Sequence, residues 1–300
     1  MTRVLLLDTS SLTYRAFFAL PASITDATGQ PVNAVRGYLD MTARLIIDHQ
    51  PDEVLHVFDA DWRPAERVAA YAGYKGERAP DPDGLPEQFP LLRRVLATLG
   101  QTCVEAPEWE ADDALAVLCA QISEPDRADI VTGDRDLIQL VRDPVVRVFY
   151  TVRGVSQLRV FDAAMVQRQY KVPPERYIDF AILRGDPSDG LPGVPGVGEK
   201  TAQRMVSQYP SLEALLADAD AQTPKLAQQL RAAAGYVEAM REVVPLRADV
   251  ALAYQHGQRD DDAADQLGTA HRIDGPINRL RAALDGGPAQ GAQVGKPLES

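Results

Sequence analysis

The chain has 300 residues, 45% of them hydrophobic and 25% charged, which is typical of a globular protein with one large or two smaller domains. Its 31 Lys and Arg against 43 Asp and Glu give a formal charge of −12, which excludes a generally basic protein that binds nucleic acid or anionic membranes. Two isolated cysteines and four histidines argue against a disulfide framework, a zinc site or histidine-based catalysis. With no membrane-length apolar run and no signal-peptide pattern, we expect no membrane partner and a cytoplasmic, nucleoid-associated location.

The first half of the chain alternates short apolar runs with amphipathic stretches. We predict strands at 4–7, 54–58, 102–105, 129–132 and 145–150. Between them we predict helices at 33–47, 90–99, 110–122 and 135–141. Strands that alternate with helices indicate an α/β fold with a mostly parallel sheet flanked by helices.

The second half reads differently, because from about Asp162 the pattern is helical almost throughout and is punctuated by prolines. We therefore predict a first domain over 1–161, a helical region over 162–284 and a disordered tail over 285–300 that is rich in Gly, Pro, Gln and Ala. The segment 61–89 is long for a connection and contains Tyr74, Lys75 and Arg78. Such long connections are usually functional or disordered.

Acidic residues follow the predicted strands or open a predicted helix: Asp8, Asp59, Asp134 and Asp136 in the first group, and Glu110, Asp112 and Asp113 in the second. The carboxyl ends of parallel strands meet at one edge of a sheet, so we expect these acids to converge. Any single one could be a helix cap, but together they repel one another unless a cation compensates. Oxygen ligands without His or Cys suit Mg²⁺ or Mn²⁺, and a site of this kind is typical of phosphodiester hydrolysis.

The most specific stretch is glycine-rich and runs over 185–202. Gly196 and Gly198 precede a predicted helix that carries Lys200 and Arg204, an arrangement that favours binding of a phosphate. It lacks the spacing of a P-loop, and a tight turn between two helices is the alternative interpretation. Asp186 and Asp189 lie just before it and extend the acid set.

Five motifs in this order resemble the 5′-nuclease (flap endonuclease) superfamily, and most of all the 5′→3′ exonuclease domain of bacterial DNA polymerase I as a stand-alone protein. The motifs are Leu5–Asp8, Val57–Ala60, Glu110–Asp113, Thr132–Leu137 and Gly185–Ala202. The resemblance covers about residues 4–244. It implies a PIN-like nuclease core, a helical arch at about 61–89 and a helix–three-turn–helix element that grips the DNA backbone.

The resemblance also implies roles for individual residues. Acids around a first metal would be Asp8, Asp59, Glu110 and Asp112; those around a second metal or its outer shell would be Asp113, Asp134, Asp136, Asp186 and Asp189. Lys75 and Arg78 would offset charge on the scissile phosphate, with a solvated arch face as the alternative. Residues that would contact DNA are Tyr14, Arg15, Tyr74, Gly196, Gly198, Lys200, Thr201 and Arg204. Carbonyls near Gly196 and Gly198 would hold K⁺. Gly190 stands where relatives commonly have Asn.

We therefore predict a monomeric, structure-specific 5′ nuclease that uses two or more Mg²⁺ or Mn²⁺ ions in DNA replication and repair. Its substrates would be DNA with a 5′ flap, nick or 5′ end, including RNA-primed ends, and its partners replication or repair proteins. Two alternatives remain open: a family member that binds flaps but cuts weakly, and a PIN-type RNase. A phosphatase with an aspartate nucleophile is excluded, because Asp8-Thr9-Ser10 lacks the required Asp-x-Asp.

Overall fold

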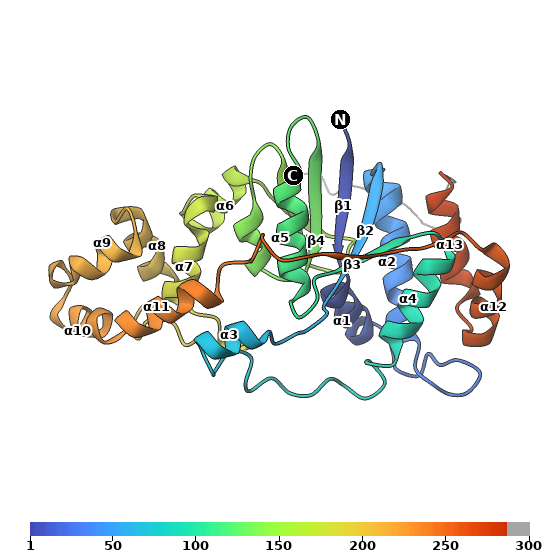
Figure 1. Cartoon of the computed structure of the whole chain (residues 1–300), viewed down its shortest axis with the longest axis horizontal. Helices are drawn as coiled ribbons and strands as arrows, with labels where there is room; N and C mark the ends of the chain where they lie inside the picture. The colour runs from blue at the N-terminus through green and yellow to red at the C-terminus, as the bar shows by residue number, and fades with distance from the viewer. Residues whose placement is uncertain (287–300) are drawn as a thin grey trace, which may run out of the picture.

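The computed structural model describes residues 1–286, and within them a seven-stranded sheet forms the centre of the molecule (Figure 1). The order is β6-β5-β4-β1-β2-β3-β7. The strands are β1 (Arg3–Asp8), β2 (Glu53–Phe58), β3 (Thr102–Glu105), β4 (Arg127–Thr132), β5 (Val146–Thr151), β6 (Leu158–Phe161) and β7 (Ala253–His256). The five inner strands are parallel and the two edge strands are antiparallel, which confirms the predicted α/β fold.

The inner strands are apolar because both faces of the sheet are covered. In β1, Leu6 packs into one hydrophobic cluster, while Leu5 and Leu7 pack into another on the opposite face. The first cluster includes α5 (Ala111–Gln121) and continues into the helical region. The second includes α2 (Asn33–His49) and α4 (Gln88–Thr98).

The predicted strands and long helices of the first half are present, with three additions and one change. Helix α1 (Thr9–Ala19) follows β1 directly, and β6 extends the sheet beyond β5; neither was predicted. The predicted helix at 135–141 is a short 3₁₀ helix, η1 (Asp136–Leu140). The third addition is the one short helix of the arch segment, α3 (Ala65–Ala70), which is followed by turns and an extended run to α4 (Figure 1).

The helical region projects from one side of the sheet (Figure 1). It contains α6 (Ala163–Tyr170), α7 (Tyr177–Arg184), α8 (Glu199–Gln208), α9 (Leu212–Ala217), α10 (Pro224–Ala232) and α11 (Ala234–Val243), with 3₁₀ turns η2 (Pro174–Arg176), η3 (Pro187–Asp189) and η4 (Ala219–Ala221).

After α11 the chain returns to the sheet, which the prediction of one helical region over 162–284 missed. Residues 244–252 cross in front of the sheet, and β7 then pairs with β3 (Figure 1). Helices α12 (Asp261–His271) and α13 (Asp274–Leu284) follow, and both pack into the cluster that covers α2. The predicted tail over 285–300 lies, from residue 287 onward, outside the described residues.

None of the helices within residues 1–286 has the length and apolar character needed to cross a lipid bilayer.

Candidate active site

The acids that follow β1 and β4 meet at one edge of the sheet, as their positions predict. Asp8 ends β1 and caps α1, because one of its oxygens accepts a hydrogen bond of 3.1 Å from the backbone N–H of Ser11. Its other oxygen accepts a hydrogen bond of 2.6 Å from the hydroxyl of Thr132, the last residue of β4. Asp134 and Asp136 follow Thr132, and the Asp134 carboxylate accepts from the backbone N–H of Asp136 at 2.8 Å.

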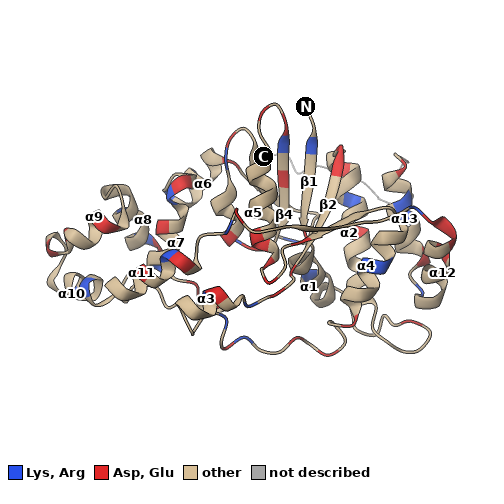
Figure 2. Ribbon diagram, viewed as in Figure 1, with Lys and Arg blue, Asp and Glu red and all other residues tan. Residues whose placement is uncertain are grey.

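The acids of β2 and α5 join the same edge. Asp59 follows β2, and its carboxylate accepts a hydrogen bond of 2.7 Å from the backbone N–H of Ala111, the first residue of α5. Glu110 is the N-cap of α5 and forms a capping box with Asp113. Glu110 and Asp113 therefore fix the start of the helix. Asp112 lies between them in the first turn and is brought to the same edge of the sheet. Figure 2 shows acidic residues gathered near the starts of α1 and α5.

Burial and mutual repulsion raise the pKa of several of these carboxyls. Desolvation raises the pKa of Asp8 to about 7, with a further contribution from Asp59. Burial first and Asp134 second raise the pKa of both Asp112 and Asp136 well above the usual range. Burial also raises the pKa of Asp59. Uncompensated carboxylates of this kind favour a bound cation.

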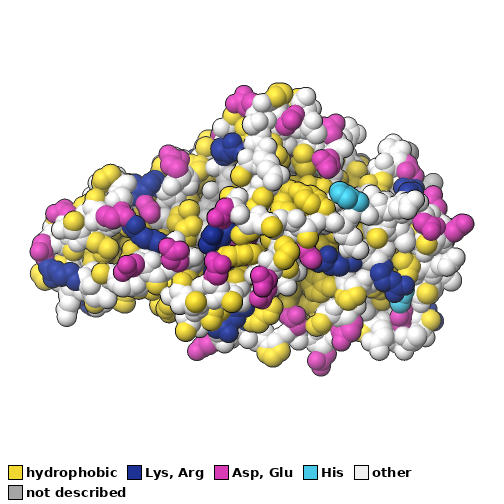
Figure 3. Space-filling model, viewed as in Figure 1, with side chains coloured by type: hydrophobic (Ala, Val, Ile, Leu, Met, Phe, Trp, Pro, Cys, Tyr) yellow, Lys and Arg dark blue, Asp and Glu magenta, His cyan; other side chains and the backbone are white. Residues whose placement is uncertain are grey.

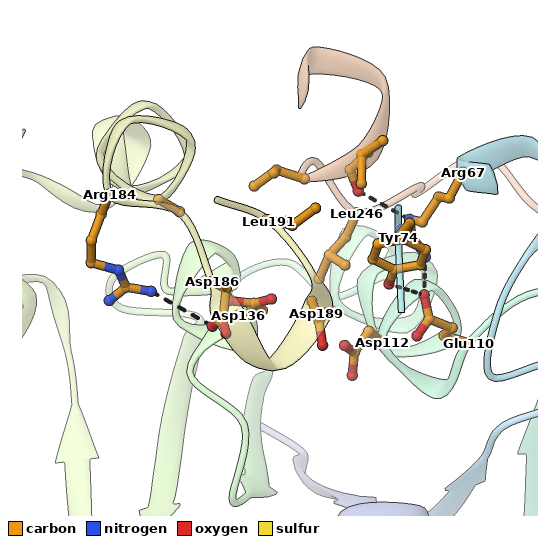
Figure 4. A pocket seen from close by; sticks show the side chains of 13 residues that line it. Arg67, Tyr74, Glu110, Asp112, Asp136, Arg184, Asp186, Asp189, Leu191 and Leu246 are labelled. Carbon is orange, nitrogen blue, oxygen red and sulfur yellow. Dashed lines mark hydrogen bonds and ion pairs between the residues drawn. The ribbon is translucent and has the colours of Figure 1, made fainter. Parts of the chain in front are cut away.

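A cavity beside this edge brings the acids of the glycine-rich segment into the set (Figure 4). Its polar lining consists of Arg67, Tyr74, Glu110, Asp112, Asp136, Arg184, Asp186 and Asp189. Asp186 caps η3 through hydrogen bonds from the backbone and hydroxyl of Ser188, and Arg184 lies 3.7 Å from its carboxylate. Of the predicted ligands, Asp8, Asp59, Asp113 and Asp134 do not line this cavity.

Cations from the arch bind two of the acids. The Lys75 ammonium forms a hydrogen-bonded ion pair with Glu110 and lies 4.0 Å from Asp189. The Arg78 guanidinium donates a hydrogen bond of 2.9 Å to Asp189. Burial raises the pKa of the Asp189 carboxyl, while Lys75 and Arg78 lower it. Lys75 is thus buried at the acid cluster, whereas Arg78 contacts Asp189 from an exposed position on the arch, with 40% of its side chain accessible.

Asp113 has a different environment from the other acids. It is fully buried, and both of its oxygens accept hydrogen bonds of 2.7 Å from the guanidinium of Arg67. The backbone N–H of Arg247 donates a third hydrogen bond of 2.9 Å. Its oxygens are therefore already engaged, and it does not line the cavity that Glu110 and Asp112 share with the acids of the glycine-rich segment.

The aromatic residues of the predicted DNA contacts are engaged within the protein. Tyr74 is 5% exposed, and its hydroxyl donates to Glu110 at 2.6 Å. Its ring lies against Arg67 and Lys75, which favours packing within the arch over base stacking in this conformation. The Tyr14 hydroxyl donates to Asp81 of the arch. Arg15 lies beside Gly133, where a Cβ on the glycine would meet its guanidinium at 2.6 Å.

The glycine-rich segment forms the turns between α7 and α8. Gly185 and Gly193 have positive φ and approach each other so closely that a Cβ on Gly185 would lie 2.3 Å from the Gly193 nitrogen. Gly196 also has positive φ and Gly198 caps α8, and both face open space. Lys200 and Arg204 are exposed on α8 and Thr201 is half-buried beside them.

The donor chemistry of the acid cluster fits divalent cations, although the side chains are not arranged as a closed site. Within residues 1–286, no three Asp, Glu, His or Cys side chains have the spacing needed to hold an ion as they stand. Asp8 is nevertheless buried, Asp112 and Asp136 are half-buried, and all three face other acids. Such oxygen donors suit Mg²⁺ or Mn²⁺.

Arg67 is the main site residue that sequence reasoning missed. It is 2% exposed, and its guanidinium binds Glu110 at 2.5 Å, Asp113 at 2.7 Å and the Val243 carbonyl at 3.0 Å. It thus joins the arch, the start of α5 and the end of α11. The only signal in the sequence is a positive charge in the arch segment, which does not reveal these long-range partners.

Comparisons with known proteins agree with the fold. Residues 3–171 match the 5′-3′ exonuclease N-terminal resolvase-like domain, and residues 172–266 match the 5′-3′ exonuclease C-terminal SAM fold. A 5′-3′ exonuclease of Streptomyces coelicolor is 42% identical over 93% of this chain and 99% of its own length. DNA polymerase I of Mycobacterium tuberculosis is 43% identical over 83% of this chain, which corresponds to 28% of that polymerase.

Solved structures share the fold at low identity. The T5 D15 protein, crystallised with metal ions, has a TM-score of 0.65 at 17% identity and covers 94% of this chain and 98% of its own. The catalytic core of Rad2, in complex with a DNA substrate, has a TM-score of 0.58 at 12% identity and covers 95% of this chain and 92% of its own. On the family models and full-length relatives, this chain belongs to the 5′-3′ exonuclease family.

Proposed function

We propose that this member of the nuclease family hydrolyses DNA at 5′ flaps, nicks and 5′ ends, including RNA-primed ends, with Mg²⁺ or Mn²⁺ held by its acid cluster. The observation that carries the proposal is the meeting of acids from β1, β2, β4, α5 and η3 beneath an arch that supplies Lys75 and Arg78. Buried like charges at one edge are costly for a protein unless cations bind there.

The acids that would hold the ions are Asp8, Asp59, Glu110, Asp112, Asp134, Asp136, Asp186 and Asp189. Bound divalent ions would supply Lewis acidity that activates water and stabilises the leaving oxygen. Asp113 would act through Arg67. The Arg67 guanidinium donates to Asp113 and also to Oε2 of Glu110, and the second hydrogen bond would orient the Glu110 carboxylate. The Thr132 hydroxyl would fix the orientation of Asp8 in the same way.

The chain's cations would bind the substrate. Lys75 and Arg78 lie next to the acids and would neutralise the scissile phosphate. Tyr14 and Arg15, on the helix that Asp8 caps, would contact the 5′ end. Gly196, Gly198, Lys200, Thr201 and Arg204 would bind the duplex backbone, with K⁺ at the glycine carbonyls. Contacts mainly to phosphates predict weak sequence preference and strong salt dependence.

A functional connection with a DNA polymerase is also proposed, since the relatives include DNA polymerase I proteins. This chain matches 28% of the length of those polymerases. This chain would act as a monomer on the 5′ ends that such polymerases reach. A flap-binding member without activity is less well supported, because every acid of the five motifs is present.

The test is product mapping on 5′-flap, nicked and blunt duplexes with Mg²⁺ or Mn²⁺. We expect cleavage at the flap junction and short products from nicks. Asp59→Ala and Asp134→Ala should abolish cleavage while leaving DNA binding largely intact. Glu238→Ala, an exposed acid on α11, is the matched control and should cleave like the wild type. Undiminished cleavage by both Asp59→Ala and Asp134→Ala would overturn the metal assignment.

A further inference from the structure

Lys75 and Glu110 form a buried ion pair at the centre of the acid cluster. The Lys75 side chain is 7% exposed and that of Glu110 is 4% exposed, and the ammonium contacts Oε1 of Glu110. A second acid, Asp189, lies 4.0 Å from the same ammonium. A buried carboxylate needs a countercharge, so Lys75 stabilises Glu110 in this conformation.

The other oxygen of Glu110 has separate partners. Its Oε2 accepts hydrogen bonds from the Arg67 guanidinium at 2.5 Å and from the Tyr74 hydroxyl at 2.6 Å. Oε1 is therefore the oxygen at which a metal ion could replace an existing partner without breaking these two bonds. At that oxygen the present partner is the Lys75 ammonium.

The two cations that bind Glu110 differ in how firmly they are held. Arg67 is fixed at several points, since it also binds Asp113 twice and the carbonyl of Val243. The Lys75 ammonium contacts the Glu110 and Asp189 carboxylates and the face of the Tyr74 ring, and it sits at the end of a flexible four-carbon chain. Exchange with an ion is therefore expected at Lys75 and not at Arg67.

The backbone of Lys75 is anchored, so an exchange would move the side chain and leave the arch in place. Its N–H donates a hydrogen bond of 2.8 Å to the carbonyl of Asp189. Nearby, a Cβ on Gly190 would lie 2.4 Å from the carbonyl oxygen of Gly73, which shows how closely the arch base packs on the η3 loop. Because the backbone of Lys75 stays bonded to Asp189, the released ammonium would remain close to the acid cluster.

We propose that Lys75 is an exchangeable countercation: it neutralises Glu110 in the metal-free protein, and a divalent ion that binds Glu110 releases its ammonium for a substrate phosphate. The inference rests on the proposed function, because it assigns Glu110 to an ion. A divalent ion at Oε1 would repel the ammonium that contacts the same oxygen, so we expect binding of the ion to displace Lys75. The same event that completes the acid site thereby delivers a positive charge to the DNA.

Amine labelling of the full chain tests the exchange directly. The protein is treated with an acetylating reagent in EDTA or in Mg²⁺, and acetylation of each lysine is followed by mass spectrometry. Exposed Lys171, Lys200 and Lys225 serve as internal references for reagent and ionic conditions. We expect Mg²⁺ to raise the relative labelling rate of Lys75 about tenfold, the ratio that corresponds to loss of one charge-assisted hydrogen bond.

A Glu110→Gln variant provides the matched control, because it removes the charge that holds Lys75 and keeps the size of the side chain. Its Lys75 should label rapidly in EDTA already, with little further change in Mg²⁺. A second measurement uses Lys75→Met, which should bind Mn²⁺ more tightly than the wild type in calorimetry. Lys225→Met, which removes an exposed positive charge of α10, should bind Mn²⁺ like the wild type.

The outcomes separate this inference from the proposed function. If Mg²⁺ raises the melting temperature of the wild type but Lys75 labels equally slowly with and without it, the exchange is overturned and the metal-dependent function stands. If neither Mg²⁺ nor Mn²⁺ binds the protein, both proposals fail. The wild-type comparison requires no variant to fold, so the test does not depend on Glu110→Gln.

Discussion

Asp112 and Asp113 are adjacent in the sequence but differ in the charge that surrounds them. Asp113 is bound by Arg67 and by the backbone of Arg247, whereas Asp112 faces Asp134 and Asp8. We therefore expect Asp113→Asn to lower the free energy of unfolding in EDTA by about 3 kcal/mol, because it leaves the buried Arg67 without its main countercharge. Asp112→Asn removes a repelled charge and should raise that free energy.

Urea unfolding of the two variants beside the wild type, all in EDTA, measures this difference. The pair is matched, since each replaces one carboxylate by an amide at neighbouring positions of α5. Equal stability of Asp113→Asn and the wild type would show that the Arg67 pair has no structural role.

The raised pKa of Asp8 predicts how stability depends on pH. Its ordinary value of 3.8 applies to the unfolded chain, and burial raises it to about 7 in the folded protein. Between these values the folded state binds more protons than the unfolded state, so stability falls as pH rises. This one group should cost the metal-free protein at most about 4 kcal/mol from pH 4 to above pH 7.

The measurement is the free energy of unfolding in EDTA across this pH range for the wild type and for Asp8→Asn. The difference between the two curves isolates Asp8 from other groups, such as Glu213, whose pKa is lowered to about 2 by a hydrogen bond from Arg241. Parallel curves would contradict the prediction.

At this scale, the sequence could predict which acids gather but not what each one contacts. Asp8 and Asp59 follow strands, so the topology of a parallel sheet is enough to bring them together. Asp113 and Tyr74 depend on Arg67 and Glu110, which are 46 and 36 residues away from them. No local pattern encodes such pairs, so the metal role for Asp113 and the stacking role for Tyr74 stay predictions that their present contacts do not favour.

Among the elements, those with strong local signals were predictable and those that depend on distant partners were not. Strand β1 is a continuous apolar run because both faces of the sheet are covered, and such runs are recognisable in a sequence. Strand β7 has four residues, three of them exposed, and exists through pairing with β3 about 150 residues earlier. The short η1 turn likewise looked like an ordinary helix, since its apolar residues are buried at helical spacing.

The return of α12 and α13 to the sheet predicts that they stabilise the nuclease core. Ile277 of α13 is fully buried in the cluster that contains α2. Ile277→Ala should lower the free energy of unfolding by about 3 kcal/mol, because it leaves a cavity between the two helices. Hydrogen exchange should then rise in α2. Val160→Ala on β6, where the side chain is 40% exposed, is the control and should change stability by less than about 0.5 kcal/mol. A small effect of Ile277→Ala would mean that α13 is dispensable to the core.

For the whole molecule, the charge of −12 is concentrated rather than spread. The nine acids of the motifs account for most of it, and without them the chain would carry −3. On the face drawn in Figure 3, basic and acidic side chains are interspersed, with no broad basic surface. DNA would therefore be bound through local cations and metal ions, which reverse the sign of the charge at the acid cluster.

This concentration of charge predicts that divalent ions stabilise the whole fold. An ion that binds only the folded protein stabilises it by about 2.7 kcal/mol when its concentration is 100 times the dissociation constant. The melting temperature should thus be higher in millimolar Mn²⁺ than in EDTA. The gain should be larger at pH 8 than at pH 5, because protons compete with the ion for carboxyls such as Asp8, whose pKa is about 7. Asp8→Asn should reduce both the gain and its dependence on pH. Identical melting temperatures in EDTA and Mn²⁺ at pH 8 would show that the acids do not form a metal site.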